Sequence, residues 1–398
     1  MVALGLVLAL SVVATPALAQ CTGTSVTNCA VNLTKSVECE TSAYTLTFNV
    51  TEGLAVNETI AVKFPATAVL TAATATVNTQ AATINAVTSG EIHILSPVAI
   101  TAGSGATVVI SNVANPVAGD WEICVKTQWD QCWCCADFEV EEGGDIDPKS
   151  AVWCPCHNIT VDIIWGASTN ITSVDGGAYG TDFIVDFDED TLTIVCSYMI
   201  GLNLTTCAVE TLNIDFDPGC NVTLAVTIAD NATVSLGTGW NLMSLPIMPI
   251  DTDIEEVLKE IDANVKSVWY YDGCDEAWYA YKNGAEFGLE TMETGKSYWV
   301  CTNDTVDLRI CGYALPCPPG APPCYCYCHC WNMVGFHSTT TMNLSDYLAN
   351  LSPAGSFFGA LTYTASGWQS VSPSTTMNPG QGYWMAFTAD LACFAPPV

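Results

Sequence analysis

PCYCYCHCW, residues 323–331, places four cysteines at alternate positions of one short stretch: Cys324, Cys326, Cys328 and Cys330. Successive side chains of an extended strand point to opposite faces, so the sulfurs would share one face and the two tyrosines and His329 the other. Neighbours on one face lie roughly 6.5–7 Å apart along the strand, too far for an easy disulfide between them. Their partners must come from another strand, domain or molecule, which favours a covalently stapled structural protein over an enzyme.

Residues 1–19 are typical of a secretory signal peptide. An apolar run extends from Val2 to Val13, and the small-residue site Ala17-Leu-Ala19 precedes Gln20. No later apolar segment has the length of a membrane span. We therefore expect a secreted protein at the extracellular cell surface, with no membrane span.

All 21 cysteines follow this segment, and outside the cell they are expected to form disulfides. Because 21 is odd, at least one thiol is idle or bonded to another chain, and both alternatives stay open. The cross-link candidates are the four cysteines of the opening stretch. Their candidate partners are Cys132, Cys134, Cys135, Cys154 and Cys156.

The charge balance is strongly acidic, with 41 acidic and 9 basic residues and a net charge of −32. Phosphate binding needs a basic surface, so a nucleic-acid partner is excluded. Charged residues are nevertheless only 13% of the chain, which is not the composition of a disordered acidic tail. Packing copies of this chain together costs electrostatic repulsion, so we expect divalent cations or covalent glycans to offset it.

Eleven Asn-x-Ser/Thr sequons are candidate glycan acceptors in a secreted protein. They are Asn32, Asn49, Asn57, Asn158, Asn170, Asn203, Asn221, Asn231, Asn303, Asn343 and Asn350.

The first part of the mature chain, 20–142, predicts an Ig-like β-sandwich. Tyr44, Leu46, Phe48 and Val50 alternate with polar residues, as do Ile60, Val62 and Phe64, and further strands are expected at 91–95, 107–113 and 121–127. After an acidic turn-rich linker, a second β-domain is expected at 150–236. Its alternating runs are Ile159/Val161/Ile163, Leu192/Ile194/Cys196/Tyr198, Leu212/Ile214/Phe216 and Val222/Leu224/Val226/Ile228.

The last part indicates a duplication. Gly239-Trp-Asn-Leu-Met243 recurs as Cys330-Trp-Asn-Met-Val334, and Gly295-Lys-Ser-Tyr-Trp299 recurs as Gly380-Gln-Gly-Tyr-Trp384. Between these motifs each copy has one short amphipathic helix, with Thr252 and Glu255 as a capping box for the first. The helix positions are Ile254, Val257, Leu258 and Ile261, then Leu344, Tyr347, Leu348 and Leu351. The predicted repeats are 238–313 and 330–398, joined by a Pro/Cys-rich linker strand at 314–329.

These motifs resemble those of known proteins. The GWNLxSLP start and the closing G-x-(G/S)-Y-W resemble small repeats of secreted archaeal surface proteins. Phe64-Pro65 and Asn112-Val-Ala-Asn-Pro116 are similar to features of archaeal surface-layer β-sandwiches. The cysteine content and acidity resemble those of methanogen sheath proteins. In the second repeat Gly335-Phe-His337 replaces Ser244-Leu-Pro246, which departs from the pattern.

A catalytic motif is not found: the sequence has no His-Glu-x-x-His, Gly-x-Ser-x-Gly or phosphate-binding loop. We therefore expect neither an enzyme nor a cofactor. Cys154-Pro-Cys156-His157 offers zinc ligands, but an oxidising compartment favours disulfides. Asp186, Asp188 and Asp190 resemble the start of a calcium loop without its glycine and distal glutamate, so solvated carboxylates are the favoured interpretation.

Seven tryptophans in the repeats could stack on sugars or form the core of two small units. They are Trp240, Trp269, Trp278, Trp299, Trp331, Trp368 and Trp384. The core interpretation is favoured, because units of this size need large buried side chains. The sequence thus predicts a mainly β structural subunit of an envelope layer, sheath or filament, whose partners are copies of itself. A secreted adhesin or carbohydrate-binding surface protein is the alternative.

Overall fold

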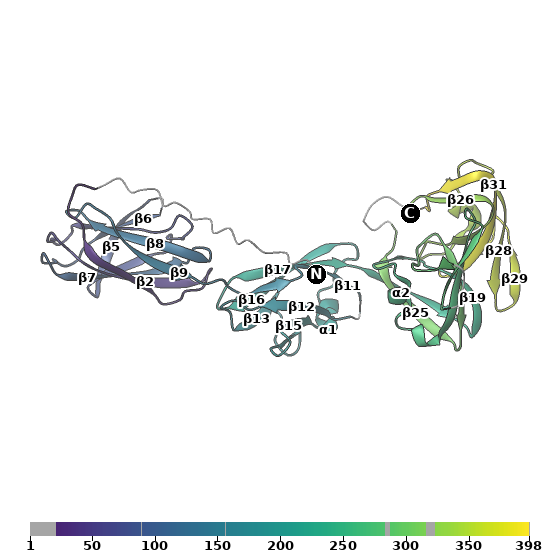
Figure 1. Ribbon diagram of the computed structural model, residues 1–398, viewed down its shortest axis with the longest axis horizontal. Helices are drawn as coiled ribbons and strands as arrows, with labels where there is room; N and C mark the ends of the chain where they lie inside the picture. Colours follow the sequence, from purple (N-terminus) through teal and green to yellow (C-terminus); the bar gives the residue numbers. More distant parts are fainter. Residues whose placement is uncertain (1–20, 89, 156, 283–286, 316–322, 398) are drawn as a thin grey trace, which may run out of the picture. The chain divides into compact units, whose positions relative to one another are not determined.

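The computed structural model describes residues 21–88, 90–155, 157–282, 287–315 and 323–397 (Figure 1). The predicted signal peptide lies outside the described residues. The chain is mainly β, as predicted, and divides into two compact units. One contains the residues up to Ile146, with Ile163–Ser173 and Ile214–Val222, and the other contains the remainder. No helix in the described part is long and apolar enough to cross a membrane.

The first unit contains an antiparallel sheet of nine strands within the described residues, in the order β1-β2-β7-β4-β5-β6-β3-β8-β9. The strands are Thr27–Leu33 (β1), Thr41–Asn49 (β2), Thr59–Lys63 (β3), Thr74–Val77 (β4), Gln80–Thr88 (β5), Glu91–Leu95 (β6), Gly105–Ala114 (β7), Gly119–Thr127 (β8) and Cys134–Val140 (β9). The strands expected from alternation at β2, β3, β6, β7 and β8 are confirmed.

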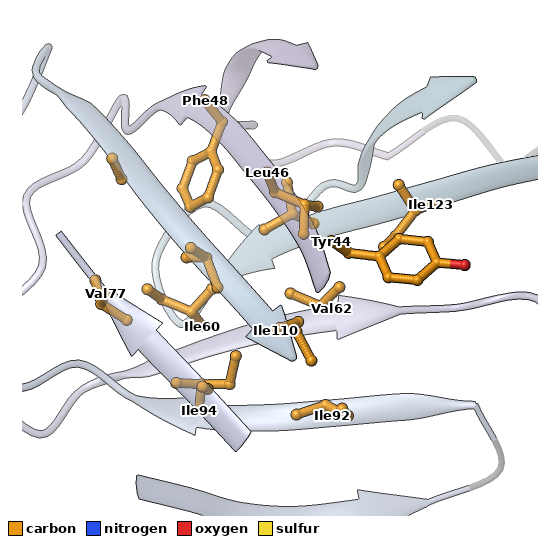
Figure 2. Packing of buried hydrophobic residues seen from close by; sticks show 14 of the residues in the cluster. Tyr44, Leu46, Phe48, Ile60, Val62, Val77, Ile92, Ile94, Ile110 and Ile123 are labelled. Carbon is orange, nitrogen blue, oxygen red and sulfur yellow. The ribbon is translucent and has the colours of Figure 1, made fainter. Parts of the chain in front are cut away.

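The core of this sheet is formed by the predicted alternating residues. Tyr44, Leu46 and Phe48 of β2 are buried and lie among side chains from β3, β4, β6, β7 and β8 (Figure 2). Burial of one such aliphatic or aromatic side chain contributes about 1.5–3 kcal/mol. The alternation therefore supplies a large part of the free energy that holds this unit together.

Disulfides join the two edges of the nine-stranded sheet. Cys29–Cys134 links β1 directly to β9, and Cys21–Cys132 links the segments that precede these strands. Cys124 and Cys135 are opposite each other on β8 and β9 and are also bonded. Cys39–Cys220 ties the sheet to the segment Ile214–Val222 of the same unit.

Two four-stranded sheets follow along the chain, in the orders β10-β12-β15-β14 and β11-β17-β16-β13. The strands are Asp145–Asp147 (β10), Ser150–Trp153 (β11), Ile159–Ile164 (β12), Asn170–Val174 (β13), Phe183–Asp186 (β14), Thr191–Ile194 (β15), Val209–Asp217 (β16) and Asn221–Ile228 (β17). The predicted inward residues of β12, β16 and β17 are buried, apart from Val222, which is half-buried.

The predicted C-terminal end of one strand in this region is wrong. The alternating run Leu192/Ile194/Cys196/Tyr198 was expected to be extended throughout, but β15 ends at Ile194 and a short helix, α1 (Cys196–Gly201), begins. The Asn158 side-chain oxygen accepts the Cys196 amide at 2.9 Å, and the Tyr198 hydroxyl donates to the Val174 carbonyl at 3.0 Å. These long-range hydrogen bonds determine the turn, and the local pattern does not contain them.

The C-terminal region contains two sheets with matching strand order. The order β19-β24-β21-β22 in the first recurs as β26-β31-β28-β29 in the second. The strands are Gly239–Ser244 (β19), Val265–Asp272 (β21), Ala277–Tyr281 (β22), Phe287–Gly288 (β23, at the edge of the first sheet), Ser297–Thr302 (β24), Tyr325–Gly335 (β26), Phe357–Thr364 (β28), Gly367–Val371 (β29) and Gly382–Phe394 (β31). Smaller sheets contain Asp230–Leu236 (β18), Met248–Pro249 (β20), Val306–Tyr313 (β25), Met342–Asn343 (β27) and Thr376–Met377 (β30).

Each repeat has the predicted short helix, α2 (Ile254–Leu258) and α3 (Leu344–Tyr347), and a 3₁₀ turn, η1 (Asp262–Asn264), follows α2. The predicted capping box at Thr252 is wrong. Asp253 is the N-cap, and its carboxylate accepts the Glu255 amide at 2.8 Å. A carboxylate caps as well as a hydroxyl and adds a favourable interaction with the helix dipole, so the helix starts one residue later.

The two repeats bind each other through equivalent backbone groups. The Ser244 amide donates to the Gly380 carbonyl at 3.0 Å, and the Gly335 amide donates to the Gly295 carbonyl at 2.6 Å. Ser244 and Gly335 occupy the same place in the two copies, as do Gly380 and Gly295. The bridges Met243 to Gln381 and Lys296 to Val334 are equivalent in the same way. The repeats are thus joined reciprocally.

An asparagine side chain shapes the start of each repeat. The Asn241 amide nitrogen donates to the Gly237 and Gly239 carbonyls at 2.7 and 3.1 Å. Asn332 donates in the same way to the carbonyls of Cys328 and Cys330 at 2.8 and 3.1 Å. The residue whose carbonyl is the second acceptor has a positive φ in both copies, +94° at Gly239 and +75° at Cys330. The turn explains glycine in the first motif, whereas cysteine adopts this conformation at a cost.

This difference between the copies predicts opposite effects of substitution. Cys330→Gly should stabilise the repeats and Gly239→Ala should destabilise them, each by about 1 kcal/mol, because only glycine adopts positive φ without strain. The measurement is the urea midpoint of tryptophan fluorescence in the oxidised full chain.

Gly359→Ala is the matched control for this pair. Gly359 has open space around its Cα, like Gly239, but no positive φ. Its substitution should move the midpoint less than that of Gly239→Ala. A loss of stability in Cys330→Gly would contradict this account.

Candidate functional site

The sulfur strand, Cys324 to Cys330, alternates as predicted over most of its length. Tyr327 is buried and Tyr325 half-buried, while Cys324 and Cys326 are exposed. The alternation ends at His329, which was expected on the tyrosine face but is exposed. The positive φ of Cys330 introduces a register shift between Cys328 and Cys330, and this bulge ends the alternation.

Two sulfurs of the strand are bonded to other segments, as the spacing requires. Cys326 is bonded to Cys393, which lies opposite it on β31, with the Cα atoms 4.1 Å apart. Cys328 is bonded to Cys274 of the first repeat, so this disulfide links the two repeats.

The candidate partners named from the sequence are bonded elsewhere. Cys132, Cys134, Cys135 and Cys154 pair with Cys21, Cys29, Cys124 and Cys311, and Cys156 lies outside the described residues. Register places Cys135 opposite Cys124 on the neighbouring strand, whereas Cys134 on β9 pairs with Cys29 on β1, the other edge strand of the sheet. The pairing expected between the sulfur strand and Cys132, Cys134, Cys135 or Cys154 is therefore wrong, while that with Cys156 stays a prediction.

In the described part of the C-terminal region, three thiols form no disulfide. Cys324 and Cys330 are exposed, and Cys301 of β24 is half-buried. The Cys330 sulfur lies 2.9 Å from His329 Nδ1. The Cys324 sulfur lies within 4.8 Å of both sulfurs of the Cys326–Cys393 disulfide.

The metal candidates do not form a complete ligand set among the described residues. The single cluster of ligand-type atoms there is Cys324, Cys326 and Cys393, and two of its sulfurs are bonded to each other. Cys154 is likewise in a disulfide. The Asp186 carboxylate accepts the Asp188 and Glu189 amides at 3.0 and 3.2 Å, which closes the turn between β14 and β15.

The sequon asparagines lie at the surface. Ten are exposed and Asn49 is half-buried. Exposure makes glycosylation of these side chains sterically feasible, and it stays a prediction.

The second candidate site is an aromatic cleft of about 470 Å³ in the C-terminal region. Its lining consists of Trp240, Trp269, Trp278, Trp299, Tyr363 and Trp368. Each of the strands β19, β24, β21 and β22 contributes one tryptophan, and the hairpin β28–β29 of the second repeat contributes Tyr363 and Trp368. The cleft therefore exists only when both repeats are in place.

The expectation that these tryptophans form core is wrong for several of them. Trp240, Trp278 and Trp368 are 48%, 40% and 51% exposed, and Trp331 outside the cleft is 39% exposed. Trp269, Trp299 and Trp384 are half-buried. The sheet has apolar residues on both faces, so alternation alone does not show which face is covered. Sequence reasoning also missed Tyr363, although it lies opposite Trp368 in a short hairpin.

Edge-to-face contacts fix the rings of the cleft. Trp299 is central: its ring centroid lies 6.3 Å from Trp240, 5.1 Å from Tyr363 and 5.6 Å from Trp368. Trp269 and Trp278 form another such pair at 6.2 Å. The interplanar angles of 65–89° show that in each pair the edge of one ring meets the face of the other, so these rings are not stacked flat on one another.

Comparisons with known proteins give no family. No family model and no curated protein matches the chain. Among solved structures it is similar to BslA, a bacterial hydrophobin, with 18% identity, covering 29% of this chain and 96% of that chain at a TM-score of 0.22. It is also similar to the Bacteroides ovatus mixed-linkage glucan utilization locus protein SGBP-B, with 11% identity, covering 70% of this chain and 83% of that chain at a TM-score of 0.22. A third similar structure is surface layer protein SbsC, domains 4–9, with 10% identity, covering 94% of this chain and 65% of that chain at a TM-score of 0.16.

At these TM-scores the likenesses carry no functional argument. The disulfides, in contrast, indicate the cellular compartment of the protein. Seven join pairs of described cysteines, and Cys207 is disulfide-bonded as well. Such a number is a property of proteins from oxidising environments, so this is an extracellular or cell-surface protein.

The buried side chain of His337 contacts Tyr325 of the sulfur strand and is expected to make the stability of the fold depend on pH. His337 is 1% exposed, its Nδ1 lies 2.7 Å from the Tyr325 hydroxyl, and its Nε2 has no partner in the described part. Burial lowers the pKa of His337 to about 4. The unfolded chain binds this proton below about pH 6.5, whereas the folded chain does not until about pH 4.

We therefore expect His337 to reduce stability as the pH falls from about 6.5 to 4, by roughly 2–3 kcal/mol in total. Equilibrium unfolding at pH 7.5, 5.5 and 4.5 measures this loss. His337→Gln should lose less stability over that interval than the parent chain. Equal losses in the two proteins would show that His337 does not cause the dependence.

Proposed function

We propose that the protein is a structural subunit of an extracellular layer, sheath or filament, in which disulfides join copies of the chain. The observation that supports this most directly is the sulfur strand. Most described cysteines are paired within the chain, yet two exposed thiols, Cys324 and Cys330, remain on this strand. As part of this proposal the protein has no catalytic activity of its own.

The position of the strand suits association between copies. β26 is an edge strand, paired within its sheet only with β31 in the described part. The C-terminal end of β26 is already bonded to the first repeat at Val334 and Gly335. A second chain would therefore bind at its N-terminal end, beside the exposed thiols. Two β26 edges that approach each other would bring their exposed thiols together without rearrangement of either core.

The bond itself is ordinary thiol oxidation. Two thiols on different chains lose two protons and pass two electrons to an extracellular oxidant such as molecular oxygen, and one S–S bond forms. The reactive species is the thiolate. His329 lies next to the Cys330 sulfur and can accept its proton.

Repulsion between subunits has to be offset in such an assembly. Copies of net charge −32 repel one another, and divalent cations or salt reduce this cost. The exposed sequons support the further proposal that covalent glycans separate the acidic surfaces. The proposed partners are therefore divalent cations and covalent glycans, in addition to other copies of the chain.

Non-reducing gel electrophoresis tests the cross-link. Protein secreted under oxidising conditions should give a ladder of multimers that collapses to monomer with dithiothreitol. The double variant Cys324→Ser/Cys330→Ser should lose the ladder, because no exposed thiol of the sulfur strand remains.

Cys301→Ser is the matched control, since Cys301 is also free but half-buried on β24. It should retain the ladder. A parent protein that runs as monomer without reductant would refute the proposal, as would a ladder that persists in the double variant.

A further inference from the structure

The aromatic cleft is unrelated to the sulfur chemistry and points to a binding function. We propose that it binds neutral carbohydrate, with the apolar faces of pyranose rings stacked on tryptophan and sugar oxygens accepting hydrogen bonds from indole N–H groups. This inference does not depend on cross-linking between copies, so either proposal can fail alone.

The exposure of the rings is the first argument for a ligand. Three of the large exposed aromatic residues, Trp240, Trp278 and Trp368, are 40–51% exposed, and all three line the same cleft. Single exposed aromatic residues are common, but a cluster of this size is a recognised sign of an interaction surface. The volume of about 470 Å³ lies in the roughly 300–1,000 Å³ range of small-ligand sites.

The difference between the two repeats is the second argument. Trp299 faces Trp269 across the ladder, whereas its equivalent Trp384 faces Leu361. Tyr271 stacks on Trp384 with ring centroids 5.7 Å apart and an interplanar angle of 28°, whereas its equivalent Tyr363 meets Trp299 edge to face, at 5.1 Å and 65°. A ring needed only for the fold would be expected in both copies. The first repeat instead has an additional indole in a cleft that stays open.

The polar groups of the cleft distinguish sugar from lipid. In the described part, none of the five cleft tryptophans donates its indole N–H to a protein acceptor. A purely apolar ligand would remove these donors from water without replacing the hydrogen bonds, which is costly. Sugar hydroxyl and ring oxygens can accept from them while the C–H faces cover the rings.

Charge narrows the ligand class further. None of the described residues that line the cleft is charged, although the chain carries a net charge of −32. An anionic glycan would be repelled by the protein as a whole and would find no cation in the cleft. A neutral oligosaccharide avoids both penalties.

The test uses the oxidised full chain and neutral hexasaccharides of glucose, N-acetylglucosamine and mannose. Titration calorimetry and tryptophan emission should show saturable binding of at least one of them. Trp278→Ala and Trp368→Ala should each weaken that binding roughly tenfold or more, because each removes a stacking surface. Trp368→Phe retains a ring and should lose less, and an unchanged thermal midpoint confirms that each variant is folded.

Trp331→Ala is the matched control. Trp331 is 39% exposed and is the equivalent of Trp240, but it lies outside the cleft. It should bind like the parent protein. Equal weakening by Trp331→Ala, or no binding of any hexasaccharide at millimolar concentration, would overturn the proposal.

Two further ligands complete the test, since aromatic surfaces also bind other chemistry. Tetramethylammonium probes cation–π recognition, and a proline-rich peptide with the sequence of residues 316–323, with serine for Cys317, probes polyproline binding. Binding of either one in the cleft, without binding of the sugars, would also overturn the proposal.

Discussion

Two equivalent backbone hydrogen bonds, from Ser244 to Gly380 and from Gly335 to Gly295, hold the C-terminal repeats against each other. The aromatic cleft depends on this junction. It places the hairpin of Tyr363 and Trp368 against Trp299, which completes the aromatic cleft. It also brings Cys274 to Cys328, so the disulfide reinforces covalently what the hydrogen bonds align.

Local periodicity predicted much of the architecture. Alternation identified β2, β3 and β6 with their buried faces, and helical spacing identified α2 and α3, because in these elements one face is clearly apolar. Internal similarity identified the two repeats. In each of these elements the pattern of apolar residues lies within a short stretch of sequence, and nearly all the residues that it predicts to be buried are buried in the structure.

The sites were harder to predict because they depend on residues far apart in sequence. The pairing of Cys326 with Cys393 depends on the register of β26 and β31. The exposure of Trp368 depends on which face of a doubly apolar hairpin the other repeat covers. The start of α1 depends on Asn158, 38 residues before Cys196. None of these relations leaves a periodic trace in the sequence.

The two exposed thiols of the sulfur strand, Cys324 and Cys330, also limit the kind of material the subunit can form. In polymer chemistry a monomer with two reactive groups condenses into linear chains or closed rings, and a branched network requires three. If Cys324 and Cys330 each bond a different neighbour, the covalent connectivity is that of a thread. Any extension into two dimensions would then come from non-covalent association between threads. Reductant would cut the covalent links along each thread and leave these lateral contacts in place.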